Sequence, residues 1–261
     1  MHLRAFHLAE RQKSACRGQR LASVKQGILL GIVLMTFLFA GAGRGETAPY
    51  GTGGLLPESE PAPLQRLEDA WMIGDSFSAP FDTIGHFPGM DIEYEIGMSL
   101  RLLNRSKAVR FNGRTMRVPE KIKLKQPSAL YLWLGSNGID RSKAADILLD
   151  YETLLQTIRD EFPNLPLYCI SATPVRAKAM ERYSGYSPEK ILEFNLGLLS
   201  LTEKYGAYYL DFHSLLVGED GYLKTEYAAG DGIHMAYKTY ELLKDYILRH
   251  MAGPLSGKEP N

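Results

Sequence analysis

The chain contains little cysteine, and this shortage limits both its architecture and its chemistry. Only two of its 261 residues are cysteines, and Cys16 precedes a long apolar stretch near the N-terminus, so Cys169 stands alone in the remainder. A disulfide within the folded part is therefore excluded, and stability must come from a hydrophobic core. Cys169 lies in an apolar, strand-like run, which is typical of a buried thiol that packs as a small hydrophobic side chain rather than a nucleophile.

The sequence also lacks the patterns of a metal site or a nucleotide site. No group of residues has metal-ligand spacing, and no glycine-rich phosphate loop follows a predicted strand. We therefore expect no metal and no other cofactor. No internal repeat is visible, and nothing in the sequence indicates the oligomeric state.

Net charge is zero for the whole chain, but the charges are unevenly distributed. Residues 1–26 hold six bases and one acid, whereas from Pro49 onward 23 bases face 28 acids, a net charge of −5. Bulk charge of this sign argues against binding to nucleic acid. One stretch departs from it, because residues 101–125 contain nine bases and a single acid. This basic run predicts either a solvated surface around an irregular loop or a track for an anionic polymer of the cell envelope.

An uncharged apolar run follows the basic N-terminal residues. Residues 27–43 contain no charged side chain, and Ala40-Gly41-Ala42 resembles a signal-peptidase cleavage site. At 17 residues the run is at the lower limit for a membrane-spanning helix. Residues 1–43 therefore predict either a cleaved signal peptide or an N-terminal membrane anchor, with membrane association through residues 27–43. In both cases the rest of the protein is expected outside the cytoplasm, secreted or anchored, because the bases precede the apolar run.

The remaining sequence predicts a single α/β domain. Residues 44–66, rich in Gly, Pro and Glu, predict a flexible linker, residues 67–253 the domain, and residues 254–261 a disordered tail. Apolar runs predict strands at residues 70–73, 129–134, 167–171 and 207–212, with a partly exposed or edge strand at 91–96. Helical periodicity predicts a helix from an N-cap at Ser142 to Pro163, one from an N-cap at Ser187 to Gly206, and one over about 236–251. This alternation predicts a central, mostly parallel, five-stranded sheet.

Two short motifs suggest a nucleophile and its base. Gly74-Asp75-Ser76-Phe77 follows the first predicted strand, where a turn can present a serine at the edge of the sheet. Asp231-Gly232-Ile233-His234 lies far downstream and offers an imidazole with a carboxylate three residues earlier. A serine hydroxyl is a weak nucleophile until a base takes its proton, and a carboxylate orients that base. Each motif alone has an ordinary structural reading, as a helix cap for Ser76 and as a surface turn for Asp231.

The motifs together resemble the SGNH (GDSL-type) hydrolases, esterases and acylhydrolases with a flavodoxin-like, three-layer fold. The resemblance covers residues 69–251, and the chain is most similar in its last motif to bacterial, extracytoplasmic members of the family. It implies Ser76 as the nucleophile, His234 as the general base and acid, and Asp231 as the residue that orients His234. His213 follows a predicted strand end and is the rival base.

The resemblance also implies an oxyanion hole made by three groups. These are the backbone N–H groups of Ser76 and Gly97 and the side-chain amide of Asn137. The assignment of Gly97 is the weakest of the three, because Gly85 or Gly89 could provide the backbone N–H group instead. The family's third block often reads Gly-x-Asn-Asp, whereas Gly138 follows Asn137 here, which puts loop geometry and substrate preference in doubt.

The expected function is therefore that of a serine esterase or acylhydrolase that works through an acyl-enzyme. Its expected partner is an ester substrate, a small molecule or an O-acetyl group carried by carbohydrate or a cell-envelope polymer. Two alternatives stay open: an O-acyltransferase that uses the same triad, and a non-catalytic binding module on the same scaffold. The acyl-chain length and the alcohol half of the ester are not determined by the sequence.

Overall fold

The computed structural model describes residues 53–253. The predicted signal peptide or anchor, the first part of the predicted linker and the C-terminal tail from residue 254 lie outside the described residues. Among the helices of residues 53–253, none combines the length and apolarity needed to cross a bilayer.

A six-stranded sheet forms the centre of the domain, and every pairing in it is parallel. Its strand order is β1-β8-β7-β6-β2-β3. The strands are β1 (Gly54–Leu55), β2 (Trp71–Gly74), β3 (Asp91–Tyr94), β6 (Leu130–Trp133), β7 (Leu167–Ile170) and β8 (Tyr208–Leu210). The five predicted strands are all present, and β3 is an edge strand as expected. The sixth strand, β1, was not predicted.

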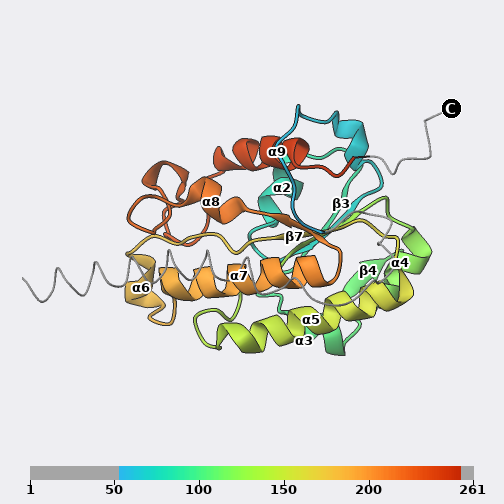
Figure 1. Ribbon diagram of the computed structural model, residues 1–261, viewed down its shortest axis with the longest axis horizontal. Helices are drawn as coiled ribbons and strands as arrows, with labels where there is room; N and C mark the ends of the chain where they lie inside the picture. Colours follow the sequence, from blue (N-terminus) through green and yellow to red (C-terminus); the bar gives the residue numbers. More distant parts are fainter. Residues whose placement is uncertain (1–52, 254–261) are drawn as a thin grey trace, which may run out of the picture. The chain divides into compact units, whose positions relative to one another are not determined.

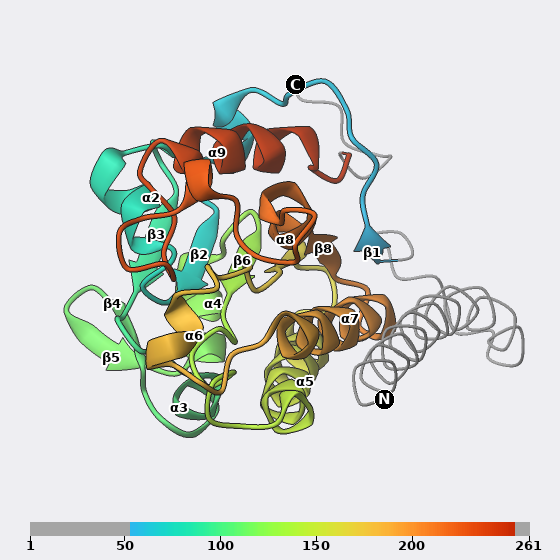
Figure 2. The ribbon, with the colours of Figure 1, turned by 90° about the vertical axis from the view of Figure 1, so that its left-hand side faces the viewer.

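Helices cover both faces of the sheet, which gives three layers (Figures 1 and 2). One face carries α3 (Leu100–Arg105), α4 (Val118–Lys125), α5 (Ala144–Glu161) and α7 (Pro188–Lys204). The other face carries α2 (Ala79–Ile84), α8 (Phe212–Leu216) and α9 (Thr239–Arg249). The short helix α6 (Ala179–Arg182) and the 3₁₀ turns η1 (Leu64–Leu67) and η2 (Thr225–Tyr227) lie in connections.

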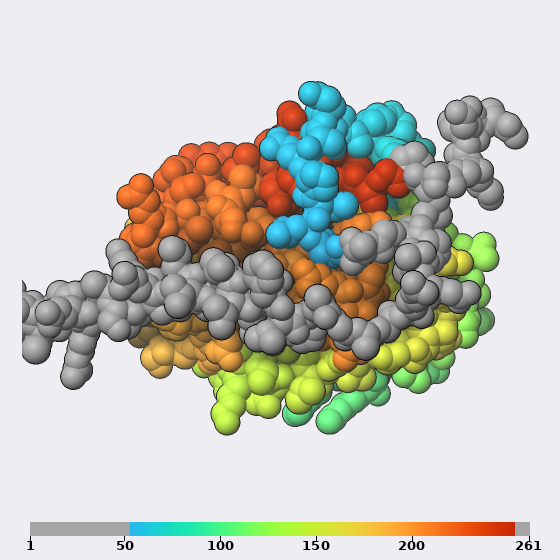
Figure 3. Space-filling view, in the orientation of Figure 1, coloured from blue at the N-terminus to red at the C-terminus, as the bar shows by residue number. Residues whose placement is uncertain are grey.

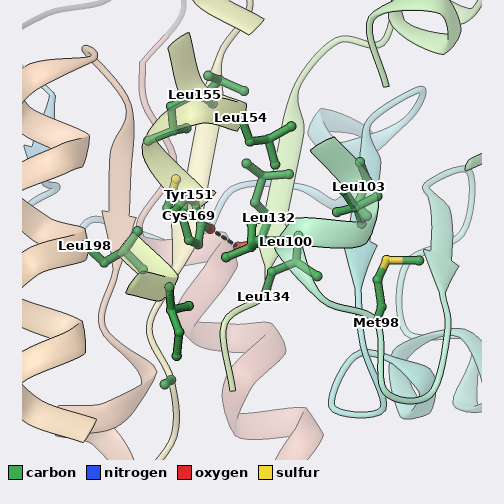
Figure 4. Close-up of a cluster of buried hydrophobic side chains, with 14 of the residues drawn as sticks. Met98, Leu100, Leu103, Leu132, Leu134, Tyr151, Leu154, Leu155, Cys169 and Leu198 are labelled. Carbon is green, nitrogen blue, oxygen red and sulfur yellow. Dashed lines mark hydrogen bonds between the residues drawn. The ribbon is translucent and has the colours of Figure 1, made fainter. Parts of the chain in front are cut away.

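The buried strands explain why this sheet needs two helical layers. Successive side chains of a strand point to opposite faces, so a continuously apolar strand must be covered twice. In β6, Leu130 and Leu132 belong to the core on the α5 side, whereas Tyr131 and Trp133 belong to the core on the α9 side. Figure 4 shows the first of these cores, where the hydroxyl of Tyr151 donates to the carbonyl of Leu132 at 3.3 Å.

Local sequence signals determine where the helices begin, with one small error of prediction. The N-cap of α7 is Ser187, whose hydroxyl accepts from the Lys190 N–H at 3.2 Å, as predicted. The N-cap of α5 is Lys143 rather than Ser142. The N–H of Ser142 instead bonds to the Gly138 carbonyl at 2.7 Å, so Ser142 still belongs to the preceding turn.

Residues 53–66 are part of the folded domain, which corrects the predicted linker boundary. Gly54 and Leu55 pair with Tyr208 and Tyr209 of β8, and the Gly54 N–H donates to Ala207 at 2.7 Å. Further along, the N–H groups of Ser59 and Ala62 donate to carbonyls at the end of α9. Figure 3 shows this segment in blue against the red C-terminal end. Composition suggested a linker, but the open edge of β8 offered backbone partners that composition does not reveal.

The opposite edge of the sheet is flanked by a small basic unit. The hairpin β4 (Val109–Phe111) and β5 (Arg114–Met116) lies between α3 and α4, beside the β3 edge (Figure 2). Lys121 of α4 is buried, and its ammonium contacts Asp91 at 3.0 Å and Glu93 at 2.8 Å. A buried lysine therefore neutralises the two acids of β3, which are themselves partly exposed.

Candidate active site

The nucleophile candidate lies in a tight turn at the carboxyl end of β2. This turn depends on Gly74, because a Cβ there would lie 2.1 Å from the Ser78 hydroxyl. Ser78 closes the turn by donating from its N–H and its hydroxyl to the Asp75 carbonyl, at 3.1 and 2.9 Å. Because β2, β3 and β6 are parallel, the segments that carry Ser76, Gly97 and Asn137 all leave the same edge of the sheet.

A loop between η2 and α9 carries the base candidate. The Ala229 N–H donates to the His234 carbonyl at 2.8 Å, and the Arg176 N–H donates to the Gly232 carbonyl at 2.8 Å. The side chain of Lys178 adds a bond to the Gly230 carbonyl at 2.7 Å. The segment after β7 thus holds this loop from one side. On the other side, the ring of His234 packs against Phe77, with the ring centroids 4.9 Å apart.

The structure brings Ser76, His234 and Asp231 together in one hydrogen-bonded series. The Ser76 Oγ lies 2.9 Å from His234 Nε2, although 158 residues separate them in the chain. His234 Nδ1 lies 2.7 Å from Asp231 Oδ2. With the Nδ1 proton donated to the carboxylate, Nε2 is left to accept the serine proton, which is the tautomer that general-base catalysis requires.

Hydrogen bonds prepare Asp231 for this orienting role. Its Oδ1 accepts from the backbone N–H groups of Ile233 at 2.9 Å and His234 at 3.0 Å. Partial burial raises the pKa of Asp231, but the bonds from the His234 ring and these two N–H groups outweigh it, so the pKa is lowered. The carboxylate therefore stays ionised near neutral pH, where an imidazolium would form beside it.

A second carboxylate, Asp75, links the serine turn to Asn137. Its Oδ1 accepts from the Phe77 N–H at 3.0 Å, and its Oδ2 accepts from Asn137 Nδ2 at 2.7 Å. Asp75 has no exposed surface, and this burial raises the pKa of its carboxyl to about 6, against the opposing effect of the Phe77 N–H. Asp75 is a positioning residue, because it holds both Asn137 and the backbone that follows Ser76.

The amide of Asn137 is not free to stabilise an oxyanion in this structure. In addition to Asp75, its Nδ2 reaches the Met98 carbonyl at 3.3 Å. Both amide protons are thus engaged, whereas the resemblance implied a free donor. The contact with Met98 is long for a hydrogen bond, so it is the one that a substrate oxygen would replace at the smaller energetic cost.

The position of Gly97 fits the oxyanion role better than those of its rivals. Gly97 follows the carboxyl end of β3, has φ of +81°, and has open space where a Cβ would be. Gly85 ends α2 and donates its N–H to Asp82 at 3.1 Å, and Gly89 lies before β3, at the wrong edge of the sheet. Among the bonds of residues 53–253, none uses the N–H of Ser76 or Gly97. The roles in the oxyanion hole stay predictions.

The rival side chains are placed elsewhere. His213 is not the base that contacts Ser76, because the Ser76 hydroxyl is bonded to His234. The backbone N–H of His213 donates to the Ser171 hydroxyl at 2.9 Å, and burial lowers the pKa of the His213 ring. Cys169 is fully buried, and burial raises the pKa of its thiol to about 12, which makes it inert as a nucleophile. Trp71 and Trp133 are buried in the core. No group of three or more potential metal ligands occurs within residues 53–253.

Two site residues escaped the sequence reasoning, Asp75 and Met98. Asp75 stands directly beside Ser76, so its place in the motif was a usable signal, but its partner Asn137 is 62 residues away. Met98 accepts from Asn137 through its backbone carbonyl, and the identity of a side chain does not predict a role of its backbone.

Comparison with known proteins agrees with this geometry. Residues 72–242 match the GDSL-like Lipase/Acylhydrolase family. Among solved structures, a candidate acylhydrolase from Bacteroides fragilis shares 15% identity at a TM-score of 0.56, over 72% of this chain and 88% of its own.

A GDSL-like lipase from Bacteroides thetaiotaomicron shares 14% identity at a TM-score of 0.53, over 72% of this chain and 89% of its own. At such identities these likenesses concern the fold. The search of curated proteins gives no match. The family match spans most of the chain, including the serine turn and the histidine loop, so the protein belongs to the GDSL-like lipase/acylhydrolase family and is an ester-hydrolysing enzyme with the SGNH fold.

Proposed function

We propose that the protein is a serine esterase that removes short acyl groups from a hydrophilic substrate, O-acetylated carbohydrate above all. The main support for this proposal is the series of hydrogen-bond contacts from Asp231 through His234 to Ser76. Ser76 Oγ attacks the ester carbonyl while its proton passes to His234 Nε2. The proton then goes to the leaving alkoxide, which departs as the alcohol and leaves an acyl-enzyme. Water, deprotonated by His234, releases the acid and restores Ser76.

Exposure of the site supports hydrolysis over acyl transfer. The side chain of His234 is 35% exposed and that of Asp231 is 48% exposed, so water reaches both members of the pair. An acyltransferase has to keep water from its acyl-enzyme. Product analysis with an added saccharide acceptor tests this choice, and acyl transfer to the saccharide in preference to water would overturn it.

A charged hollow near the site supports a polar carrier for the ester. This hollow of about 420 Å³ lies along β3 and has Met98 in its lining, whose carbonyl contacts Asn137. Charged side chains contribute much of its lining, among them Glu93, Glu95 and Arg110. Long acyl chains bind in apolar tunnels, whereas this lining favours a hydrated substrate.

The decisive experiment compares ester substrates with the purified protein. We expect turnover of p-nitrophenyl acetate to exceed that of the octanoate, and we expect release of acetate from acetylated xylan. Labelling of Ser76 by a fluorophosphonate, located by mass spectrometry, identifies the nucleophile. Labelling at another residue would reject the assignment, and a preference for the octanoate would reject the substrate class.

The site is proposed to work outside the cytoplasm. The support is the sequence alone, namely the basic residues 1–26 followed by the uncharged residues 27–43. Fractionation of expressing cells, with protease protection of the intact chain, tests this location. Recovery of the protein in the cytoplasm would contradict it.

A further inference from the structure

The basic residues from α3 through the β4–β5 hairpin to α4 divide into two groups in the structure. Four of the nine bases in residues 101–125 have acidic partners. These are Arg101 with Asp150, Lys121 with Asp91 and Glu93, Lys123 with Glu161, and Lys125 with Asp91. The other five are exposed, and within residues 53–253 no ion pair involves them. They are Arg105, Lys107, Arg110, Arg114 and Arg117, and we call them the basic hairpin surface.

This concentration of positive charge stands against the charge of the rest of the domain. From Pro49 onward the chain carries a net charge of −5. Neighbouring acids do not neutralise the five bases, since Asp91 and Glu93 are already bound to Lys121. Glu120 accepts from the Arg117 backbone N–H at 2.9 Å at the start of α4, and Glu95 is the exposed acid on the rim of the adjoining hollow. Like charges gathered without partners cost stability unless a ligand uses them.

The surface is connected to the active site. Arg110 and Met98 line the same hollow of about 420 Å³. The Met98 carbonyl contacts Asn137, which is bonded to Asp75 in the serine turn. A chain lying on the hairpin could therefore place a pendant group in the hollow and a neighbouring ester at Ser76.

We propose that the basic hairpin surface binds an acidic polysaccharide, so that the esters cleaved at Ser76 are those of a polyanionic chain. This inference rests on the proposed function, which it narrows from carbohydrate in general to polymers with carboxylate groups. A polysaccharide fits better than a lipid bilayer, because the hairpin tip is Asn112-Gly113 and offers no apolar side chain for insertion. In addition, β1, the first strand of the domain, lies at the edge of the sheet opposite to β3 and the basic hairpin surface.

The test compares acetylated homogalacturonan, which is acidic, with acetylated xylan, which is neutral. The surface variant is Arg105→Gln with Arg110→Gln and Arg114→Gln. We expect the ratio of kcat/KM on the acidic polymer to kcat/KM on the neutral polymer to fall about tenfold, the lower end of electrostatic steering effects. The matched control removes three surface bases that have partners elsewhere, as Lys204→Gln, Lys244→Gln and Arg249→Gln. We expect that ratio to stay at the wild-type value in the control.

A binding experiment separates failure of this inference from failure of the proposed function. Ser76→Ala protein, which cannot turn over the polymer, is titrated with acetylated homogalacturonan by calorimetry. We expect binding that weakens with salt, between about 0.02 and 0.3 M, and that is lost with the three glutamines. Equal binding by the surface variant, or tighter binding to anionic vesicles than to the polymer, would overturn the inference and leave the esterase assignment intact. Absence of ester hydrolysis by the wild-type protein, with polymer binding retained, would overturn the proposed function alone.

Discussion

The active site contains two aspartates with opposite electrostatic character. Asp75 lies in the serine turn with no exposed surface, and its pKa is raised to about 6 by burial. Asp231 lies in the histidine loop with its side chain 48% exposed, and its pKa is lowered. Asp75 accepts two hydrogen bonds, one through each oxygen, whereas Asp231 accepts three, two of them through Oδ1. At Asp75 full burial outweighs the bonds and favours the neutral carboxyl, whereas at Asp231 the bonds outweigh partial burial, so Asp231 is the reliable anion at pH 6.

The largest loss of activity is expected when the Ser76 hydroxyl, which is hydrogen-bonded to His234, is removed. Ser76→Ala should lower kcat on p-nitrophenyl acetate by about 10⁶-fold, because Ser76 is the only nucleophilic side chain of residues 53–253 that is hydrogen-bonded to His234. The control is Ser200→Ala, on the exposed side of α7, which should keep turnover and fluorophosphonate labelling. Turnover of folded Ser76→Ala protein at the wild-type rate would mean that the site lies elsewhere.

The next change tests Asp231. Asp231→Asn should lower kcat by about 10⁴-fold, because an amide in place of the carboxylate favours the wrong tautomer of His234. The asparagine oxygen can still accept from the Ile233 and His234 N–H groups, so the melting temperature should fall only slightly. A loss of tenfold or less in kcat would show that His234 is oriented without Asp231.

A smaller loss is expected at the buried aspartate. In Asp75→Asn, the new amide cannot accept from both Phe77 and Asn137, because one of its two positions is an NH₂ group. Asn137 then loses its orientation, and kcat should fall about 10²-fold, as for the loss of one oxyanion donor. Asp82→Asn, on the exposed side of α2, is the matched control. Unchanged kcat in Asp75→Asn would remove this residue from the site.

The two aspartates should also give opposite pH dependences of stability. The pKa of Asp75 is raised from 3.8 to about 6 on folding, so the folded state holds its proton more tightly than the unfolded chain. Its contribution is absent below about pH 4, and it lowers the free energy of unfolding by up to about 3 kcal/mol as pH rises through 6. For Asp231 the pKa is lowered, so its stabilisation is present above pH 4 and is lost as pH falls.

Urea unfolding between about pH 4 and pH 8 measures this difference. Asp75→Asn should remove the decline in stability between pH 4 and pH 6, whereas Asp231→Asn should leave that decline in place. A decline of equal size in Asp75→Asn protein would assign it to another group.

Much of this architecture was readable from the sequence, for physical reasons that differ between elements. Runs such as Leu130–Trp133 are apolar at every position, and only a strand covered on both faces explains them in a domain of this kind. The Ser76 and His234 motifs are local, so the type of chemistry could be predicted, although their distance apart could not. β1 was missed because two residues of strand have no periodicity, and their partner β8 is remote in sequence.

The roles of backbone groups could not be predicted in the same way. The Met98 carbonyl and the Asp75 carboxylate both accept from the side-chain NH₂ group of Asn137, and this arrangement exists only once β2, β3 and β6 are side by side. The buried Lys121 is a similar case, since a lysine in a basic run predicts a solvated side chain. Its partners Asp91 and Glu93 are set by the register of β3.

The pairing of Gly54 and Leu55 with β8 has a practical consequence for anyone who prepares this domain. A fragment that starts at residue 67 would lose its outermost strand and uncover the backbone groups of Tyr208 and Tyr209. An unpaired edge strand can pair with a strand of another molecule, so such a fragment should self-associate. Expression boundaries are better placed upstream of Gly53, so that β1 is retained.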